Sequence, residues 1–373
     1  MLSLIVTLTC GFYLLLAFIV ALNTQKVNIK ANKWLALFLL SVGGVMLNEP
    51  FIALKLYERY PHLIGYGKIF ILLIAPTLYL SILYFVNPTR IFQKKDYWHF
   101  FPTVLVLFLN IPFYLEKKEE KLADLTMIYD VYDRIETFFL VIIPISVYWF
   151  FAYRKLTRHQ RNVQFFASSI EAIDLSWLRN FLFGIIPIVL LLLNEVLIIF
   201  PIVIQISSTL YALSAFYLTY FIVKQVEIFP EKTVEALDIQ AIIEETNQNT
   251  ERKKLLNDEQ LTVLKEQLKY IMENSKPYLE SSLTLHKLAN MMSLNTHELS
   301  YLVNVGFEDN FFGLINRYRV EESKRILLST QYQHFSMVGI AFEAGFNSKT
   351  AFNTAFKKVE GISPTEFQKL KSA

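Results

Sequence analysis

The C-terminal stretch A-G-F-N-S at residues 344–348, followed by G-I-S-P at residues 361–364, is the most informative part of this sequence. Glycine adopts a left-handed backbone conformation at low cost, so Gly345 suits a sharp turn at the end of a helix. Asn347 or Ser348 can cap the helix that follows. The pattern predicts helices at Val338–Ala344 and Ser348–Val359, which together form a helix-turn-helix unit.

A first unit of the same kind precedes this one. One helix begins at Leu283 and, after a short turn, leads into a second helix at Thr296–Val305. Asn295 or Thr296 can cap this second helix. Asn295 is followed three residues later by Glu298, an arrangement similar to a capping box. A longer helix at Asn310–Leu328 joins the two units.

Apolar side chains recur on one face of each predicted helix, and we interpret them as core residues rather than ligand contacts. They are Leu285, Leu288, Ala289, Met292, Leu299, Leu302 and Val303 in the first unit, Phe311, Ile315, Val320 and Leu327 in the joining helix, and Ile340, Ala341, Phe346, Phe352 and Phe356 in the second unit. The opposite faces are left for solvent or a ligand.

Together these features resemble the DNA-binding domain of the AraC-type bacterial transcription regulators. The resemblance covers about a quarter of the chain and rests on spaced positions: Leu288-Ala289, Leu299, residues 310–327, Ile340-Ala341, Gly345-Phe346, Phe352, Phe356-Lys357-Lys358, Gly361 and Ser363-Pro364. Two features depart from the family pattern. Ser323 stands where alanine is frequent, and Val305-Gly306 replaces a polar or basic run.

The resemblance implies that two recognition helices enter adjacent stretches of the DNA major groove. Base contacts are then expected from His297, Ser300, Tyr301, Lys349, Thr350, Asn353 and Thr354, with a phosphate contact as the competing role for His297. Phosphate contacts are expected from Arg317, Arg325, Lys357 and Lys358. Residues 283–373 carry ten basic and eight acidic side chains, so we expect a modest affinity that falls with added salt.

The rest of the chain has the composition of a membrane protein. Hydrophobic residues make up 54% of the sequence, 32 residues are Phe, and the apolar residues concentrate before residue 225. Seven segments are long enough, or nearly so, to cross a bilayer: Leu2–Leu22, Trp34–Leu54, Leu63–Val86, Tyr97–Leu115, Ile135–Tyr153, Leu178–Phe200 and Ile202–Val223. Counts of six or eight stay open. The first segment lacks a cleavage pattern and is predicted to be a retained helix.

Basic residues predict the orientation of these segments. They gather after the first, third and fifth: Lys26, Lys30 and Lys33; Arg90, Lys94 and Lys95; Arg154, Lys155, Arg158 and Arg161. Such loops face the cytoplasm. With seven crossings, the N-terminus lies outside and the C-terminal domain lies in the cytoplasm, where DNA is.

Polar residues recur at one depth, one to two turns from the predicted outer ends of the segments. They are Asn48, Glu49, Lys68, Asn110, Glu136, Asn194, Glu195 and Gln205. Ionisable groups within a membrane are costly unless they are paired or solvated. The pattern indicates a shallow cavity that senses a signal. The alternative is pairing that only holds helices together, such as Lys68 with Glu49 or Glu195.

Between the two parts, residues 225–280 carry 12 acidic and seven basic side chains. Leu261, Leu264, Leu268 and Ile271 predict an amphipathic helix at Asp258–Asn274. Its apolar seam suits either a short coiled coil between two protomers or, as we favour, an extra helix packed on the following domain.

The sequence therefore predicts an all-α protein with three parts: a seven-helix transmembrane sensor at residues 1–224, a helical linker at 225–280 and an AraC-type domain of two helix-turn-helix units joined by a long helix at 281–373. We expect a one-component transcription regulator of the bacterial cytoplasmic membrane. Its expected partners are promoter DNA, the bilayer and an unknown external or membrane-borne ligand, and a homodimer stays open.

The alternative function is a membrane receptor whose C-terminal domain binds another protein. An enzyme is not expected, because the sequence offers no histidine cluster with metal spacing, no glycine-rich phosphate loop and no nucleophile elbow. Neither a cofactor nor a metal is expected. Cys10 is the only cysteine in the sequence, so an intrachain disulfide is excluded.

Overall fold

The computed structural model describes residues 2–22, 28–111, 134–135, 137–169, 174–223, 256–332 and 334–372. These residues are mostly helical, and their β-structure is limited to one isolated bridge, so the predicted all-α class is confirmed. The chain divides into two compact units. The N-terminal unit contains Met1–Thr157 and Leu175–Glu231, and the C-terminal unit contains Arg158–Asp174 and Lys232–Ala373.

Long apolar helices make up the N-terminal unit. They are α1 (Leu2–Leu22), α2 (Ile29–Met46), α5 (Gly67–Val86), α10 (Ile143–Val163), α11 (Ser176–Leu193) and α12 (Pro201–Val223). Shorter elements are α3 (Asn48–Ala53), α4 (Leu56–Arg59), η1 (Pro61–Leu63), η2 (Lys94–Phe100), α6 (Phe101–Leu109), η3 (Phe138–Ile142) and η4 (Asn194–Ile198). Within the described residues, six helices are long and apolar enough to cross a membrane, as judged by length and composition.

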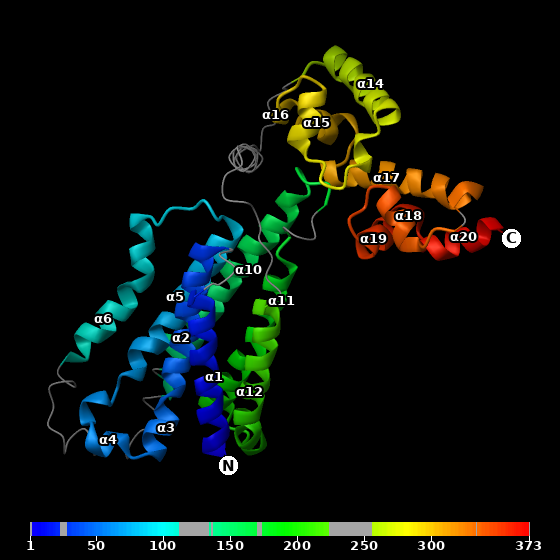
Figure 1. Ribbon diagram of the computed structural model, residues 1–373. Helices are drawn as coiled ribbons and strands as arrows, with labels where there is room; N and C mark the ends of the chain where they lie inside the picture. The colour runs from blue at the N-terminus through cyan, green and yellow to red at the C-terminus, as the bar shows by residue number, and fades with distance from the viewer. Residues whose placement is uncertain are drawn as a thin grey trace. The chain divides into compact units, whose positions relative to one another are not determined.

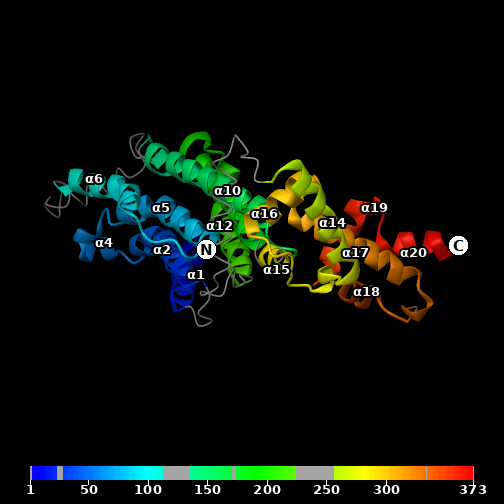
Figure 2. The same cartoon turned by 90° about the horizontal axis from the view of Figure 1, so that it is seen from above.

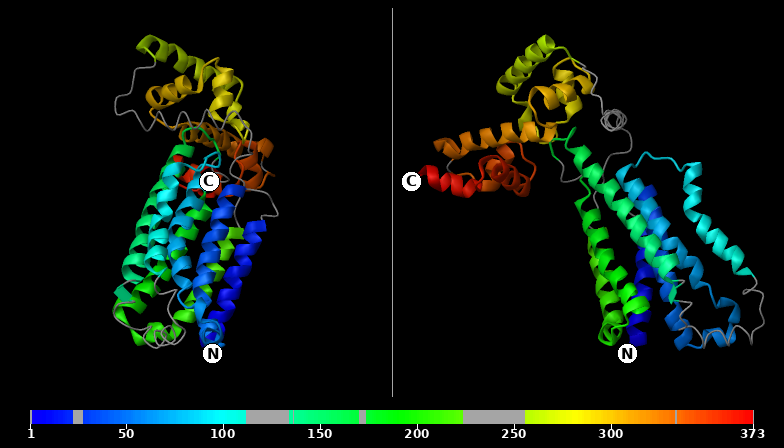
Figure 3. Two further views of the ribbon diagram at one scale, coloured as in Figure 1. Left: turned by 90° about the vertical axis from the view of Figure 1, so that its left-hand side faces the viewer. Right: turned by 180° about the vertical axis from the view of Figure 1, so that it is seen from behind.

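The predicted fourth span, Tyr97–Leu115, is not among these six. The structure describes it only as far as residue 111, and the described part forms η2 and the nine-residue helix α6. Figures 1 and 3 show α6 running antiparallel to α5, and α10 running antiparallel to α6. This alternation is what a crossing at α6 requires, but seven crossings remain a prediction.

Two segments that the basic residues assign to the same side meet at one end of the N-terminal unit. Lys30, at the start of α2, donates from Nζ to the carbonyl oxygen of Arg90 at 3.5 Å. The rings of Trp34 and Phe92 stack with their centroids 5.8 Å apart. Arg90 also pairs with the buried Asp96 at 2.6 Å. The chain after the first span and the chain after the third therefore share one end of the unit.

The C-terminal unit contains α14 (Asp258–Asn274), η5 (Pro277–Leu279), α15 (Leu285–Met291), α16 (Thr296–Tyr301), η6 (Leu302–Gly306), α17 (Phe311–Leu328), η7 (Thr330–Tyr332), α18 (Met337–Glu343), α19 (Lys349–Glu360) and α20 (Pro364–Ser372). Figures 1 and 2 show α17 joining the α15–α16 pair to the α18–α19 pair. This is the predicted arrangement of two helix-turn-helix units and a joining helix. Helix α20 was not predicted.

Helix α14 packs inside the C-terminal unit. Asn257 and Gln260 form a capping box at its start, and Leu268 and Met272 are fully buried. At the other end of the seam, a Cβ placed on Gly306 would lie 3.6 Å from Cδ1 of Leu261, so α14 covers η6. The structure agrees with the second alternative for the apolar seam, an extra helix packed on the domain.

The core of the second helix-turn-helix unit is a row of four phenylalanines. Successive ring centroids of Phe346, Phe352, Phe356 and Phe367 lie 5.3, 5.6 and 5.4 Å apart. Val320 of α17 joins the same buried cluster. Aromatic pairs at these distances add to the stability that burial provides. The row fixes which face of α19 is buried and therefore which face is exposed.

Candidate nucleic-acid interface

The turn of the second unit depends on Gly345. Its φ is +89°, in the left-handed region, and a Cβ there would lie only 2.3 Å from the carbonyl oxygen of Tyr278 and 2.8 Å from Cα of Leu279. Glycine alone satisfies both constraints without strain. The turn between α18 and α19 therefore packs directly on the backbone that precedes the first unit.

Replacing Gly345 with alanine is expected to lower the free energy of unfolding of the C-terminal unit by about 2 kcal/mol, because it adds backbone strain and a clash. Hydrogen exchange of the full-length protein in detergent micelles measures this loss. Gly361→Ala is the matched control, because Gly361 also has a positive φ (+78°) but no atom within 4 Å of an added Cβ. An equal loss in both variants would show that the approach to Tyr278 carries no weight.

Helix α19 presents the exposed polar face that the resemblance implies. Ser348 caps the helix, since its Oγ accepts a hydrogen bond from the amide of Ala351 at 3.1 Å. Phe352 and Phe356 point into the core and are fully buried. The predicted base-contacting residues of this helix are all exposed: Lys349, Thr350, Asn353 and Thr354. The structure thus brings four of the seven predicted base contacts together on one accessible face.

In the first unit the second helix begins with the predicted cap, but it is α-helical only as far as Tyr301 and not to Val305. Asn295 and Glu298 form a reciprocal capping box at the start of α16. After Tyr301 the α-helix gives way to the π-helical turn η6, which contains Val305 and Gly306. The π turn lies where the sequence departs from the family pattern.

The remaining predicted base contacts lie on α16. His297, Ser300 and Tyr301 are all half-buried. Ser300 also accepts a hydrogen bond from Nδ2 of Asn304 at 3.3 Å. This face is less accessible than that of α19, so α19 is the stronger candidate for base contacts.

Two of the four predicted phosphate contacts are well placed. Lys357 and Lys358 are exposed in the last turn of α19. Both lie on the helix that carries the exposed polar face. Lysine at such a position can bind a phosphate oxygen and fix the register of the helix without distinguishing between bases.

The other two are engaged with carboxylates. Arg317 pairs with Asp309 at 3.2 Å, and Arg325 pairs with Glu322 at 2.6 Å. The hydrogen bond from Arg325 keeps the pKa of Glu322 below its usual value, with Lys276 acting in the same direction. The charge of each arginine is therefore partly compensated within the protein, which weakens the case for a phosphate contact.

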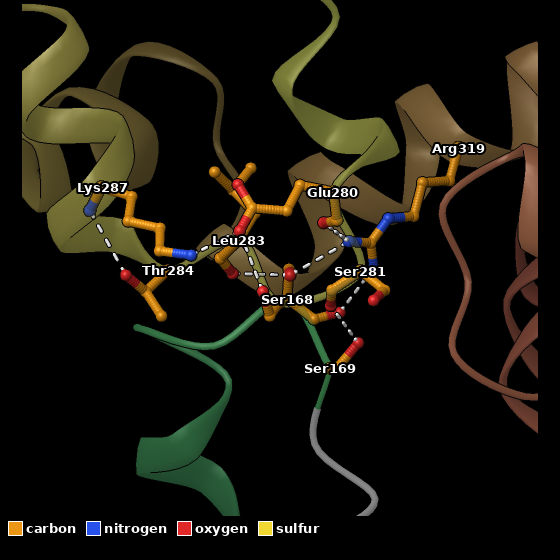
Figure 4. A network of polar contacts seen from close by, with 9 residues as sticks. Ser168, Ser169, Glu280, Ser281, Leu283, Thr284, Lys287 and Arg319 are labelled. Atoms are coloured by element: carbon orange, nitrogen blue, oxygen red, sulfur yellow. Dashed lines mark hydrogen bonds and ion pairs between the residues drawn. The ribbon is translucent and has the colours of Figure 1, made fainter.

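Sequence reasoning missed the role of Arg319, in the middle of α17. Its side chain is 1% exposed, and its guanidinium donates to the carbonyl oxygens of Tyr278 (2.7 Å), Ser168 (2.9 Å) and Glu280 (2.9 Å) and to Oγ of Ser168 (3.1 Å). Figure 4 shows the contacts with Ser168 and Glu280. The signal was present in the sequence, because Arg319 falls among buried positions of the joining helix, next to Val320.

Ser323, the other departure from the family pattern, fits the fold. It is fully buried, and its Oγ donates to the carbonyl oxygen of Val320 one turn earlier at 2.7 Å. A serine in a helix can satisfy its hydroxyl in this way without a second partner. The small side chain that the family pattern requires is therefore retained.

In the N-terminal unit, only some of the predicted polar residues lie close together. Glu195, in the π turn η4, lies beside Ser207 and Tyr211 of α12, and Glu49 contributes to its electrostatic environment. Asn48 accepts a hydrogen bond from the hydroxyl of Tyr57 at 2.7 Å. These residues form a polar cluster between α3, α4, η4 and α12.

The rest of the polar set is placed differently. Asn110 donates to the carbonyl oxygen of Val106 in its own helix, and Oδ1 of the buried Asn194 accepts from the amide of Phe200. Lys68 is half-buried at the start of α5. Glu136 and the side chain of Gln205 lie outside the described residues.

Among the residues that the structure describes, no group of three or more His, Cys, Asp or Glu side chains could hold a metal ion. Cys10 is buried in α1.

Comparison with known proteins adds one finding. A protein-family model described as a helix-turn-helix domain matches residues 288–370, which run from α15 to α20. A search of curated proteins gave no match, and a search of solved structures gave none. The matched residues include both predicted units and the helix that joins them. Residues 288–370 therefore form an AraC-type helix-turn-helix domain, and the described part of the N-terminal region carries six candidate membrane-spanning helices.

Proposed function

We propose that this protein is a membrane-held transcription regulator that binds promoter DNA directly through its C-terminal domain. The observation that carries the proposal is the exposed polar face of α19, where Lys349, Thr350, Asn353 and Thr354 lie opposite a fully buried aromatic face. Lysine can donate to guanine O6 and N7, asparagine can bind adenine bidentately, and threonine can contact either a polar edge or a thymine methyl group. This face has the composition that major-groove recognition needs.

The thin positive charge of the domain limits its affinity for any one site. Partial compensation of Arg317 and Arg325 leaves Lys357 and Lys358 as the best-placed phosphate contacts. Each phosphate contact adds to the salt dependence of binding, so few contacts mean that log K falls only gradually with the logarithm of the salt concentration. Binding as a pair of protomers on adjacent sites would raise the affinity, and we retain a homodimer as part of the proposal.

Selection from a pool of random duplex DNA tests the function. The purified full-length protein in detergent micelles is expected to enrich duplexes that share a sequence motif. The variant Lys349→Ala with Asn353→Ala serves as the comparison and is expected to lose the enrichment. A pool that stays random after repeated selection at low salt would contradict direct DNA recognition and favour the alternative, a protein-binding module.

We further propose that the apolar helices span the cytoplasmic membrane seven times, with the C-terminal unit in the cytoplasm. Three observations support this topology: six helices of suitable length, the alternating directions of α5, α6 and α10, and the contact of Lys30 with the backbone of Arg90. Basic residues near span ends favour the cytoplasmic side. A regulator with this topology has its DNA-binding domain where the chromosome is.

We also propose that the polar cluster around Glu49 and Glu195 senses the signal, because acidic groups in a membrane domain are rarely neutral in function. The charge-neutral variants Glu49→Gln and Glu195→Gln are each expected to alter a promoter reporter under at least one inducing condition. The control Glu58→Gln removes the charge of a carboxylate whose side chain is 65% exposed. An unchanged response in the cluster variants under every condition would exclude the sensing role.

A further inference from the structure

A short segment from the apolar half of the sequence belongs structurally to the C-terminal unit. Residues 164–169 follow α10 directly and lie, in sequence, between the candidate spans Phe138–Val163 and Ser176–Ile198. Their contacts nevertheless group them with the helix-turn-helix domain. We call residues 164–169 the arm.

Backbone hydrogen bonds attach the arm to the first helix-turn-helix unit. Ala167 and Thr284 form an antiparallel bridge, in which the amide of Ser168 donates to the carbonyl oxygen of Leu283 at 3.3 Å and the amide of Leu285 donates to that of Phe166 at 3.0 Å. At the other end of the arm, the amide of Phe312 in α17 donates to the carbonyl oxygen of Gln164 at 3.0 Å. The arm therefore binds both the entry to α15 and the start of the joining helix.

Burial shows that the arm is part of the domain core. Phe166 is 3% exposed, Ala167 6% and Ser168 2%, and Val163, the residue immediately before the arm, is fully buried. Peptide groups at such positions are paired in nearly all proteins, because an unpaired buried group loses its hydration without compensation. Undocking the arm would leave the amides of Leu285 and Phe312 without these partners.

Arg319 connects the arm to the junction of the two helix-turn-helix units. Its guanidinium reaches both the carbonyl oxygen and Oγ of Ser168, and the Oγ of Ser168 in turn donates to the carbonyl oxygen of Leu283 at 2.6 Å (Figure 4). The same guanidinium lies over the ring of Phe346, 5.8 Å from its centroid, in the turn of the second unit. One buried side chain thus contacts the arm and the second unit at once.

We infer that docking of the arm controls DNA binding by holding the two helix-turn-helix units in one arrangement. The arm begins at the residue after α10 ends, and α11 begins a few residues after the arm. Displacement of these two helices in the membrane would therefore move the docked arm. The other covalent connection, residues 224–257, is much longer and could reach about 100 Å if extended. The arm is the shorter path between membrane and DNA, and the inference rests on the proposed function.

Disulfide cross-linking tests the docking itself. Ala167 and Thr284 form the non-hydrogen-bonded kind of antiparallel pair, whose side chains lie close together and suit a disulfide. The full-length protein with Cys10→Ala, Ala167→Cys and Thr284→Cys is expected to cross-link in most molecules on oxidation. The control replaces Thr284→Cys with Thr365→Cys, at an exposed position of α20. Equal yields in both proteins would overturn the docking.

Control of DNA binding is tested by Ser168→Ala. This variant loses the hydroxyl contacts to Arg319 and Leu283 and is expected to bind its selected duplex about tenfold more weakly, the range for a lost hydrogen bond to a charged group. The neighbouring Ser169→Ala is the matched control. It removes an exposed hydrogen bond to Ser281 and is expected to stay within about threefold of the parent protein.

The cross-link then serves as a reversible rescue. In the Ala167→Cys, Thr284→Cys protein, Ser168→Ala is expected to bind DNA like its parent when oxidised and to lose affinity again on reduction. A loss that persists in the cross-linked form, or no loss in Ser168→Ala alone, would overturn control by the arm. If the parent protein bound no duplex at all, the proposed function would fail, while the cross-linking yield would still decide whether the arm docks.

Discussion

Replacing Arg319 with alanine is expected to lower the free energy of unfolding of the C-terminal unit by about 3–5 kcal/mol. The substitution leaves the buried carbonyl oxygens of Tyr278 and Ser168 without a donor and opens a cavity beside Phe346. Hydrogen exchange of the full-length protein in micelles reports this as a loss of protection along α17, because exchange of core amides follows the free energy of opening.

Arg317→Ala is the control for this prediction. It lies on the same helix, but its side chain is 48% exposed and pairs with Asp309 at the surface. Exposed ion pairs contribute about 0–1 kcal/mol, so exchange in α17 should barely change. Comparable losses of protection in the two variants would mean that the buried guanidinium does not stabilise the junction of the two helix-turn-helix units.

Replacing both Lys349 and Asn353 with alanine is expected to reduce the free energy of binding to a selected duplex by about 2–6 kcal/mol, since a good base contact discriminates by ~1–3 kcal/mol. Both side chains are exposed on α19, so the fold should be unaffected. Titration of the full-length protein with selected and scrambled duplexes measures the change. The two affinities are expected to become similar, because the lost contacts distinguish bases.

Lys357→Ala provides the contrasting variant. A phosphate contact stabilises all duplexes alike, so this substitution should weaken selected and scrambled DNA equally and reduce the slope of log K against log salt by about one. If Lys349→Ala with Asn353→Ala showed the same uniform loss, α19 would bind the backbone without reading bases.

The parts of this protein that local sequence signals determine were predictable. The sequence predicts a turn at Gly345 because glycine adopts a left-handed conformation at low cost, and its φ is +89°. The spacing of Asn295 and Glu298 is similar to that of a capping box, and the two residues form one. The amphipathic helix at Asp258–Asn274 follows from spacing alone, and the structure gives the same bounds. Such signals act over one or two helical turns.

What the sequence could not supply depends on residues far apart. The contact of Arg319 with Ser168 joins positions 151 residues apart, and nothing in either neighbourhood specifies the other. Glu322, which pairs with Arg325 on the same helix, also pairs with Lys276 from before the first unit. The predicted polar ring placed its residues by their distance from the predicted outer ends of the segments. The structure has a break after Met46 and a π turn at Asn194–Ile198, so only part of the set comes together.

The most direct test of the account maps the DNA that is cross-linked to the full-length protein in living cells and fractionates the membranes of the same cells. We expect the cross-linked fragments to share the motif selected in vitro and to sediment with the membrane fraction together with the intact chain. Fragments without a common sequence, or specific fragments bound only by protein outside the membrane fraction, would contradict a membrane-held regulator that binds DNA directly.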